Sequence, residues 1–175
     1  MNSPYTGKFR VSQTYHSNHH GLDLVGVDSK EIHSTINGEV IRAGWENAAN
    51  HSQGFGMRVV IKRDGTNEYY YFGHLSEIRV QVGQKVKVTD VIGIEGSTGY
   101  STGSHCHYEC RLADDRSKYQ DITKISGIPN AIGTYDDGYR PPTDTTNPTP
   151  AKPETKSVTL TIDGTTWTGE LTKKG

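Results

Sequence analysis

Short runs of alternating apolar and polar residues fill the chain up to about residue 112, and turn-forming residues separate them. Val, Ile and Tyr dominate these runs, and apolar residues recur at helical spacing only in a short turn at 120–126. The runs that predict strands are 8–14, 38–44, 57–62, 68–72, 85–88 and 105–111. Asp64-Gly65 lies between the third and fourth of these runs and predicts a hairpin turn. The pattern predicts an all-β, mostly antiparallel domain over residues 1–140.

The pattern changes from residue 141 onward. Residues 141–156 are rich in Pro and Thr and hold no apolar residue larger than Ala, which predicts an extended, solvated linker. In 157–175, Val158, Leu160 and Ile162 alternate with polar residues before Asp163-Gly164, which predicts a short β-hairpin tail. Because a lone hairpin is marginal in water, the tail either docks on the main domain or begins a further module, and the sequence leaves both open.

Length and charge narrow the class of protein. The 175 residues suffice for one ordinary domain and a tail. A net charge of −1 gives no broad basic field, so neither nucleic acid nor a membrane surface is an expected partner. The first residues lack the charged head and apolar stretch of a secretory signal, so we expect synthesis to end in the cytoplasm.

Cys106 and Cys110 are four strand steps apart, roughly 13 Å, too far for a disulfide.

Two of the eight histidines are paired within one predicted strand. Side chains alternate across a strand, so His105 and His107 project from one face. Cys106, Tyr108 and Cys110 project from the other, where they belong to the core. A single histidine is more often a surface or core residue than a ligand, but this spacing places two imidazoles side by side. The pair indicates a site on the face away from the core.

A second pair of candidate ligands lies near the N-terminus. His19 and Asp23 are four residues apart, an even spacing that puts both side chains on one side of a strand or loose turn. His20 is a nearby competitor, but it is out of register with Asp23. Catalytic zinc sites typically use three protein ligands from imidazole and carboxylate groups, and this pair with one histidine of the HxH pair makes that number. The H-x-x-x-D spacing alone occurs often by chance.

Several motifs in order resemble one family. HHGLD at 19–23, FGHL at 72–75 and GSTGYSTGSHCHYE at 96–109 are similar to motifs of the lysostaphin-type (LytM-like) zinc metallopeptidases, which cleave bacterial peptidoglycan. The resemblance extends over about residues 8–112. It implies a β-sandwich of the duplicated-hybrid-motif type with an active-site groove on one sheet face, and a zinc metallopeptidase domain over 1–140.

The resemblance also implies roles for particular residues. His19, Asp23 and His107 would bind one Zn²⁺ ion, while His74 and His105 would lie beside it without binding it. We expect His105 to be the general base with His74 as its partner, and the reverse order stays open. Histidine side chains in general titrate near neutral pH, which suits proton transfer.

Other residues are given less definite roles. Tyr15 is the candidate that donates its hydroxyl to the oxyanion, and an interior aromatic residue of the first strand is an equal alternative. Glu109 shares the face of the histidine pair and either orients a ligand or is an exposed edge charge. We expect the loops at 46–53 and 97–104 to flank the groove, and the asparagines that would rim it are Asn18, Asn47 and Asn50.

These motifs predict a zinc-dependent endopeptidase that hydrolyses peptide cross-links or stem peptides of peptidoglycan, acting as a monomer. The first alternative is a non-catalytic relative that regulates wall remodelling, and the second is a sugar phosphotransferase carrier with paired histidines. Family members cut glycyl-glycine bridges or D-alanyl links, and the sequence leaves the scissile bond open. The missing signal and the Pro/Thr-rich linker favour a phage-released or virion-associated lysin, or a fragment of a secreted enzyme.

Overall fold

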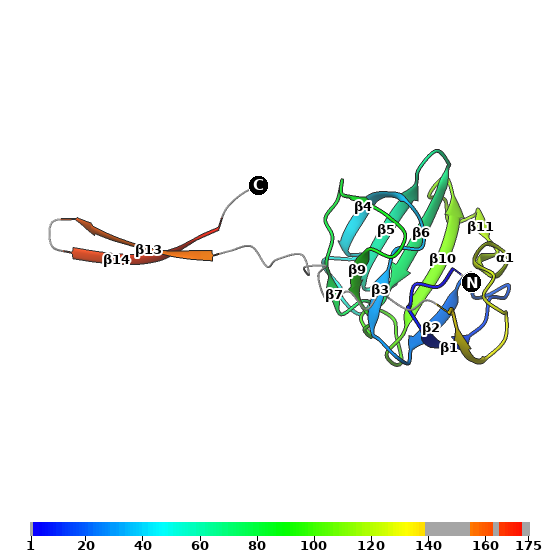
Figure 1. Ribbon diagram of the computed structural model, residues 1–175. Helices are drawn as coiled ribbons and strands as arrows, with labels where there is room; N and C mark the ends of the chain where they lie inside the picture. Colours follow the sequence, from blue (N-terminus) through cyan, green and yellow to red (C-terminus); the bar gives the residue numbers. More distant parts are fainter. Residues whose placement is uncertain (1, 139–154, 163–164, 173–175) are drawn as a thin grey trace. The chain divides into compact units, whose positions relative to one another are not determined.

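The structure is a computed structural model that describes residues 2–138, 155–162 and 165–172. The chain divides into two compact units, Met1–Pro141 and Pro142–Gly175. The elements of the first unit are β1 (Lys8–Gln13), β2 (Leu22–Gly26), β3 (Glu31–His33), β4 (Gly38–Trp45), β5 (Met57–Arg63), β6 (Glu68–Gly73), β7 (Glu77–Ile78), β8 (Lys85–Val86), β9 (Val91–Ile94), β10 (Cys106–Leu112), β11 (Tyr119–Gln120), α1 (Ile122–Ser126) and β12 (Gly133–Asp136) (Figure 1).

Two sheets make up the first unit. The larger one has nine strands in the order β12-β1-β2-β10-β6-β5-β4-β8, with β11 paired to β10, and the smaller one has the order β3-β9-β7. Every strand pair in the two sheets is antiparallel. The large sheet runs across the unit in Figure 1, with β10 between β2 and β6. The prediction of an all-β, mostly antiparallel fold is therefore confirmed.

The hairpin turn and the helical turn lie where the sequence predicts them. β5 and β6 are joined through Asp64-Gly65, and the left-handed φ of +69° at Gly65 is one that glycine adopts without strain. The predicted helical turn is α1, which begins after Asp121, whose carboxylate accepts a hydrogen bond from the backbone N–H of Thr123. It ends at Gly127, again in the left-handed region.

The core lies on one face of β10. Cys106, Tyr108 and Cys110 are fully buried there, and neither cysteine is in a disulfide, as predicted. The same core cluster contains Ile32 of β3 and Ile92 of β9, so the small sheet shares its core with the large one. The apolar side of β10 thus anchors the strand and leaves its other side for polar residues.

Strand register brings distant parts of the chain to one place on that other side. His107 of β10 is directly opposite Asp23 of β2 on one flank and Gly73 of β6 on the other. Directly opposed residues in an antiparallel pair have Cβ atoms about 4.5–5.5 Å apart. The sheet therefore places His107 and Asp23 side by side. His74 follows the last residue of β6, Gly73, which is opposite His107.

The second unit contains two described strands, β13 (Thr155–Ile162) and β14 (Thr165–Thr172), which pair antiparallel with Leu160 opposite Trp167. The Asp163-Gly164 turn and residues 139–154, which include most of the expected linker, lie outside the described residues. Among the residues described, no helix has the length and apolar character needed to cross a membrane.

Candidate metal centre and groove

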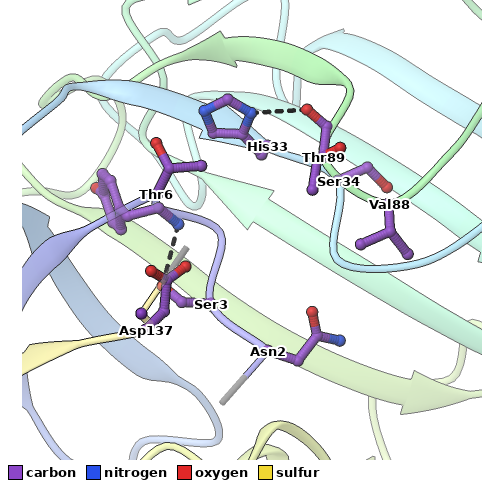
Figure 2. A pocket seen from close by; sticks show the side chains of 10 residues that line it. Asn2, Ser3, Thr6, His33, Ser34, Val88, Thr89 and Asp137 are labelled. Atoms are coloured by element: carbon purple, nitrogen blue, oxygen red, sulfur yellow. Dashed lines mark hydrogen bonds between the residues drawn. The ribbon is translucent and has the colours of Figure 1, made fainter. Parts of the chain in front are cut away.

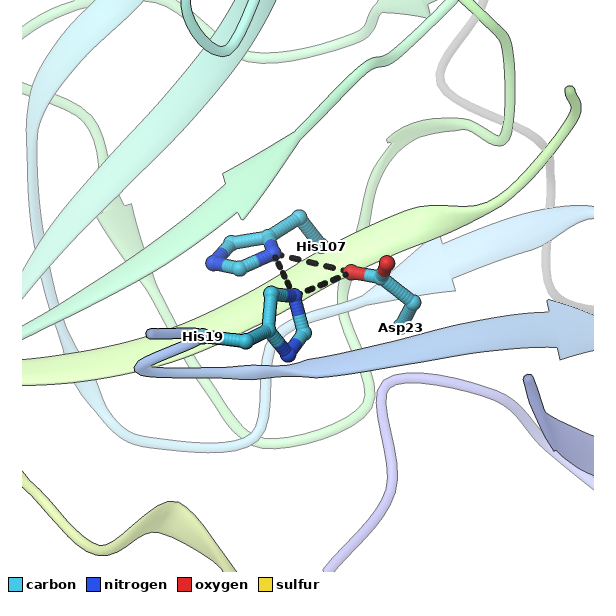
Figure 3. A group of neighbouring side chains, drawn as sticks. All are labelled: His19, Asp23 and His107. Carbon is cyan, nitrogen blue, oxygen red and sulfur yellow. Dashed lines mark hydrogen bonds and ion pairs between the residues drawn. The ribbon is translucent and has the colours of Figure 1, made fainter. Parts of the chain in front are cut away.

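Three side chains converge at the junction of β2 and β10. The Oδ1 atom of Asp23 lies 3.1 Å from Nε2 of His19 and 2.8 Å from Nδ1 of His107, and the two imidazole nitrogens are 3.2 Å apart (Figure 3). These donor atoms all lie within 4.8 Å of one another, so one metal ion can contact all three. Figure 3 shows His19 reaching across from its loop toward the strand that carries His107.

The local fold explains why the three side chains meet. His16 and His19 exchange two backbone hydrogen bonds of 2.9 Å, which close a tight turn and direct His19 toward the sheet. At Gly21, a Cβ atom would lie 2.5 Å from Nε2 of His107, so this position has no room for a side chain. The glycine between the two ligands allows the loop to lie directly against the imidazole of His107.

Hydrogen bonds fix which nitrogen of each ligand imidazole faces the centre. His19 donates from Nδ1 to the carbonyl oxygen of Thr14 at 2.8 Å, and this bond leaves Nε2 facing Asp23. Nε2 of His107 is 3.2 Å from a carboxylate oxygen of Glu109, to which it donates, and Nδ1 faces Asp23. A ligand histidine whose distal N–H is bound in this way has a fixed tautomer and ring orientation. The donor set of two imidazoles and one carboxylate suits zinc.

The electrostatics of the centre favour positive charge. Burial disfavours the charged form of Asp23, but hydrogen bonds from His107 and His19 outweigh it and lower the pKa of this carboxyl below its ordinary range. Burial also disfavours a charged His107, yet its hydrogen bonds with Asp23 and Glu109 raise its pKa to about 9. The same carboxylates that favour a proton here favour a metal cation in its place.

A second histidine pair lies beside the three candidate ligands. The ring centroids of His74 and His105 are 4.6 Å apart, and Nε2 of His105 is 3.6 Å from Oδ2 of Asp23. His74 donates from Nδ1 to the carbonyl oxygen of Thr98 at 2.7 Å, and His105 donates from Nδ1 to that of Gly103 at 2.9 Å. Burial lowers the pKa of His74 to about 4, so it is neutral at pH 7. Both rings can therefore accept a proton at Nε2.

These five residues open onto one groove of about 520 Å³ on the face of the large sheet. Its walls come from the loop after β4 and from the loop between β9 and β10, as expected from the sequence. Among the other side chains that line it are Asn18, Phe55, Tyr100, Glu109, Arg111, Arg116 and Tyr119.

Comparison with known proteins assigns the family. The model of peptidase family M23 matches residues 17–121, more than half of the chain, and this span holds all five residues. The chain belongs to peptidase family M23. The resemblance to lysostaphin-type metallopeptidases is thereby confirmed, and the family includes peptidoglycan endopeptidases.

Two relatives of this M23 chain show the extent of the similarity. It is 37% identical to lysostaphin of Staphylococcus staphylolyticus over 124 residues, which are 66% of this chain and 24% of lysostaphin. It is 36% identical to the glycyl-glycine endopeptidase ALE-1 of Staphylococcus capitis over 92 residues, which are 53% of this chain and 24% of that protein. The matched part thus spans about a quarter of the length of these curated relatives.

The fold is similar to a solved M23 structure. The catalytic domain of the antimicrobial peptidase lysostaphin from Staphylococcus simulans aligns with a TM-score of 0.57 and 27% sequence identity. The alignment covers 69% of this chain and 91% of that domain. The predicted lysostaphin-like β-rich fold is therefore that of this M23 chain.

Tyr15 is the one predicted catalytic residue that does not line the groove. Its ring is half-buried and packs against the core, 6.5 Å from the ring of His20. Its backbone N–H and carbonyl oxygen are both bound by the side chain of Asn130, at 2.9 and 3.0 Å. This placement agrees with the alternative of an interior aromatic residue, and a role in stabilising the oxyanion stays a prediction.

The other secondary candidates are also placed. Glu109 is buried, so the alternative of an exposed edge charge is wrong. His20 stacks on Tyr119 with ring centroids 3.8 Å apart and lies outside the cluster of three ligands. Asn18 lines the groove as expected, whereas Asn47 and Asn50 do not: their side chains bond within their own loop, to Gln53 and Ser52.

Thr98 and Arg111 were missed by the sequence analysis. The hydroxyl of Thr98 donates to the carbonyl of Leu75 and accepts from the N–H of Met57, and these bonds hold the carbonyl that His74 binds. Thr98 lies within the 96–109 motif, but nothing in that motif marks its hydroxyl as a support for His74. Arg111 shares the period-two face of His107 on β10, and this alternation could have revealed it.

A separate cavity of about 360 Å³ lies away from the groove and is lined by His33, Ser34 and Thr89 among others (Figure 2). His33 donates from Nδ1 to the carbonyl oxygen of Thr89 at 2.8 Å, which Figure 2 shows as a dashed line. None of the five residues at the metal centre lines this cavity.

Proposed function

We propose that this chain is a zinc-dependent endopeptidase that hydrolyses peptide cross-links or stem peptides of bacterial peptidoglycan. The observation that carries the proposal is the convergence of His19, Asp23 and His107 within one groove, beside two further histidines with fixed tautomers. A regulator without catalysis would need only the fold, whereas this chain keeps three candidate ligands and two candidate proton carriers.

The three ligand side chains would hold one zinc ion. Bound zinc supplies Lewis acidity that polarises a peptide carbonyl and lowers the pKa of a nearby water molecule. Asp23 contributes one negative charge, so a divalent ion held by it and two neutral imidazoles keeps a net positive charge for polarising the substrate. The carbonyl of Thr14 and the carboxylate of Glu109 would keep the two imidazoles in the binding orientation.

His105 and His74 would move the protons. The Nε2 atom of His105 lies near Asp23, where it can take a proton from the attacking water and pass it to the leaving amine. His74 is held neutral by burial and lies against His105, where its ring can hold the water or accept the proton in turn. The water oxygen bonds to the carbonyl carbon, the C–N bond breaks, and the amine leaves with the transferred proton.

We further propose that the enzyme acts on the cell wall as a monomeric lysin that is phage-released or virion-associated, or that it is a fragment of a secreted enzyme. The similarity to lysostaphin, whose catalytic domain is that of an antimicrobial peptidase, supports this bacteriolytic role. All five residues of the proposed centre come from one chain, so catalysis would need no second copy. Clearing of purified walls by the added protein, together with its mass by light scattering, tests both parts.

The decisive experiment is mass spectrometry of fragments released from walls of known bridge chemistry. Walls with glycyl-glycine bridges and walls with direct D-alanyl links are treated with the zinc-loaded protein and with the protein stripped by a chelator. We expect new amino termini with the zinc-loaded protein alone, and the bridge type that is cut identifies the scissile bond. Zinc binding without release from either wall would contradict the enzyme and favour a regulator.

A further inference from the structure

Glu109 is a buried carboxylate on the groove face of β10, two residues after His107. Its side chain is 4% exposed, and its Oε2 atom lies 3.2 Å from Nε2 of His107. The opposite nitrogen of the same ring faces Asp23 and His19. Glu109 therefore contacts the proposed zinc ligand on the side away from the metal.

Arg111 holds the other oxygen of this carboxylate. Its Nε–H donates to Oε1 of Glu109 in a close ion pair. The guanidinium carbon lies 4.2 Å from the ring centroid of Tyr71, 5.1 Å from that of Tyr119 and 5.5 Å from that of Phe55. Cation–π contacts of this kind stabilise a desolvated guanidinium. Three rings and one carboxylate thus fix Arg111 in a single place.

We propose that Glu109 and Arg111 are positioning residues, which orient His107 and set the zinc affinity of the centre. This proposal rests on the proposed function, because it assumes zinc at His19, Asp23 and His107. Glu109 holds the ring of His107 with its Nδ1 atom toward the centre. Arg111 holds Glu109 and balances its charge, so the buried carboxylate keeps one orientation. Partners of this type typically change metal affinity by about 10- to 100-fold.

The position of Arg111 distinguishes this role from substrate binding. Its side chain is 6% exposed although it lines the groove, so little of it can meet a substrate carboxylate. A substrate-binding arginine would change KM when replaced, while a positioning arginine would change metal affinity with KM kept at saturating zinc.

The test measures metal binding directly. Zinc affinity is determined by competition with a chromogenic chelator for the wild-type chain, Glu109→Gln and Arg111→Lys, and the visible spectrum of the Co²⁺-substituted proteins reports the ligand geometry. We expect about 10- to 100-fold weaker zinc binding for Glu109→Gln, a smaller loss for Arg111→Lys, and a shifted Co²⁺ spectrum in both. KM for wall fragments should stay unchanged at saturating zinc.

Glu68→Gln is the matched control. Glu68 also pairs with an arginine on the large sheet, Arg63 at 2.9 Å, but lies outside the groove. Its zinc affinity and Co²⁺ spectrum should equal those of the wild type. If Glu109→Gln does not fold, Arg111→Lys decides by the same measurements.

Two results would overturn the inference while leaving the proposed function intact. Wild-type zinc affinity in both variants together with a raised KM would assign the pair to substrate binding. Wild-type affinity with only a lower melting temperature would assign it to stability. Absence of zinc binding by the wild-type chain would instead contradict the proposed function itself.

Discussion

Both faces of β10 are buried over residues 106–111, but their side chains differ in polarity and charge. Over residues 106–111, the core face carries two thiols and one phenol, whereas the groove face carries an imidazole, a carboxylate and a guanidinium, and all six residues are buried. The core face consists of Cys106, Tyr108, Cys110 and the partly buried Leu112, and the groove face of His107, Glu109 and Arg111. Burial of apolar groups is favourable by itself, whereas each buried charge needs a partner. Alternate residues of this strand therefore have different tasks: one set packs in the core, and the other set forms the candidate site.

The largest effect is expected from His107→Ala. The change removes one of three candidate ligands and leaves Asp23 with His19 alone, so we expect loss of bound zinc. General acid–base catalysis typically contributes about 10²- to 10⁴-fold to a rate. Wall hydrolysis by His107→Ala should fall by more than this. Metal analysis after dialysis and fragment release from walls measure both effects. One zinc ion retained per chain would remove His107 from the ligand set.

His105→Ala should separate the ligands from the proton carriers. We expect hydrolysis to fall by about 10²- to 10⁴-fold while zinc stays bound, because His105 faces Asp23 without belonging to the cluster of three. His51→Ala is the control, since His51 is an exposed imidazole that stacks on Trp45 outside the groove. A zinc-free His105→Ala protein would show that this division of roles is wrong.

Glu95→Gln tests a buried carboxylate away from the groove. Glu95 accepts hydrogen bonds from Tyr5, the backbone N–H of Gly26, Lys30 and Ser104. Losing the charge leaves donors unpaired, so we expect the free energy of unfolding at pH 7 to fall by about 3 kcal/mol, with unchanged zinc content. Denaturant unfolding measures this loss.

The same variant predicts a pH dependence. Burial alone would raise the pKa of Glu95, but hydrogen bonds from Lys30, Ser104 and Tyr5 outweigh it and lower the pKa. A lowered pKa contributes stability that is full above the unfolded value of about 4.3 and is lost as the pH falls through the folded value. The wild type should therefore lose its advantage over Glu95→Gln in acid. An advantage that grows below pH 4 would contradict this account.

The smallest effect is expected on the core face. The hydroxyl of Tyr108 donates to Oγ1 of Thr35 at 2.9 Å, and Tyr108→Phe removes this one buried bond. We expect the free energy of unfolding to fall by about 1 kcal/mol, with zinc affinity and hydrolysis unchanged. Thermal or denaturant unfolding and the wall assay measure these quantities. A loss of zinc affinity in Tyr108→Phe would show that the two faces are coupled.

Part of this fold follows from sequence alone. The runs that became β1, β4, β5, β6 and β10 are long enough, and rich enough in Val, Ile and Tyr, to show their period, and the run 85–88 contains the short β8. The strands β2, β3, β7, β9, β11 and β12 were not predicted, since they are short and are completed by their pairing partners. β9, for example, is four residues with Gly93 inside it, and it pairs with both β3 and β7.

The candidate site divides in a similar way. The alternation of β10 predicted that His105 and His107 share a face, and the spacing of His19 and Asp23 indicated the second pair. Glu109, which orients His107, was a candidate from its place on the strand. The acceptors that fix the tautomers of the other three histidines could not be predicted, because the carbonyls of Thr14, Thr98 and Gly103 carry no side-chain signature. Their positions depend on how three loops fold against the sheet.

The lack of a side chain at Gly21 bears on which relatives can form the same three-residue centre. Even an alanine at this position would push its methyl group into the ring of His107 and the carbonyl oxygen of Tyr108. A homologue with a larger residue here could therefore retain all three metal-binding side chains and still fail to bring them together. In a mutational scan, substitution of Gly21 should be tolerated as poorly as substitution of the candidate ligands His19 and Asp23, although glycine offers no donor atom. A survey that counts donor residues alone would overestimate the number of working enzymes.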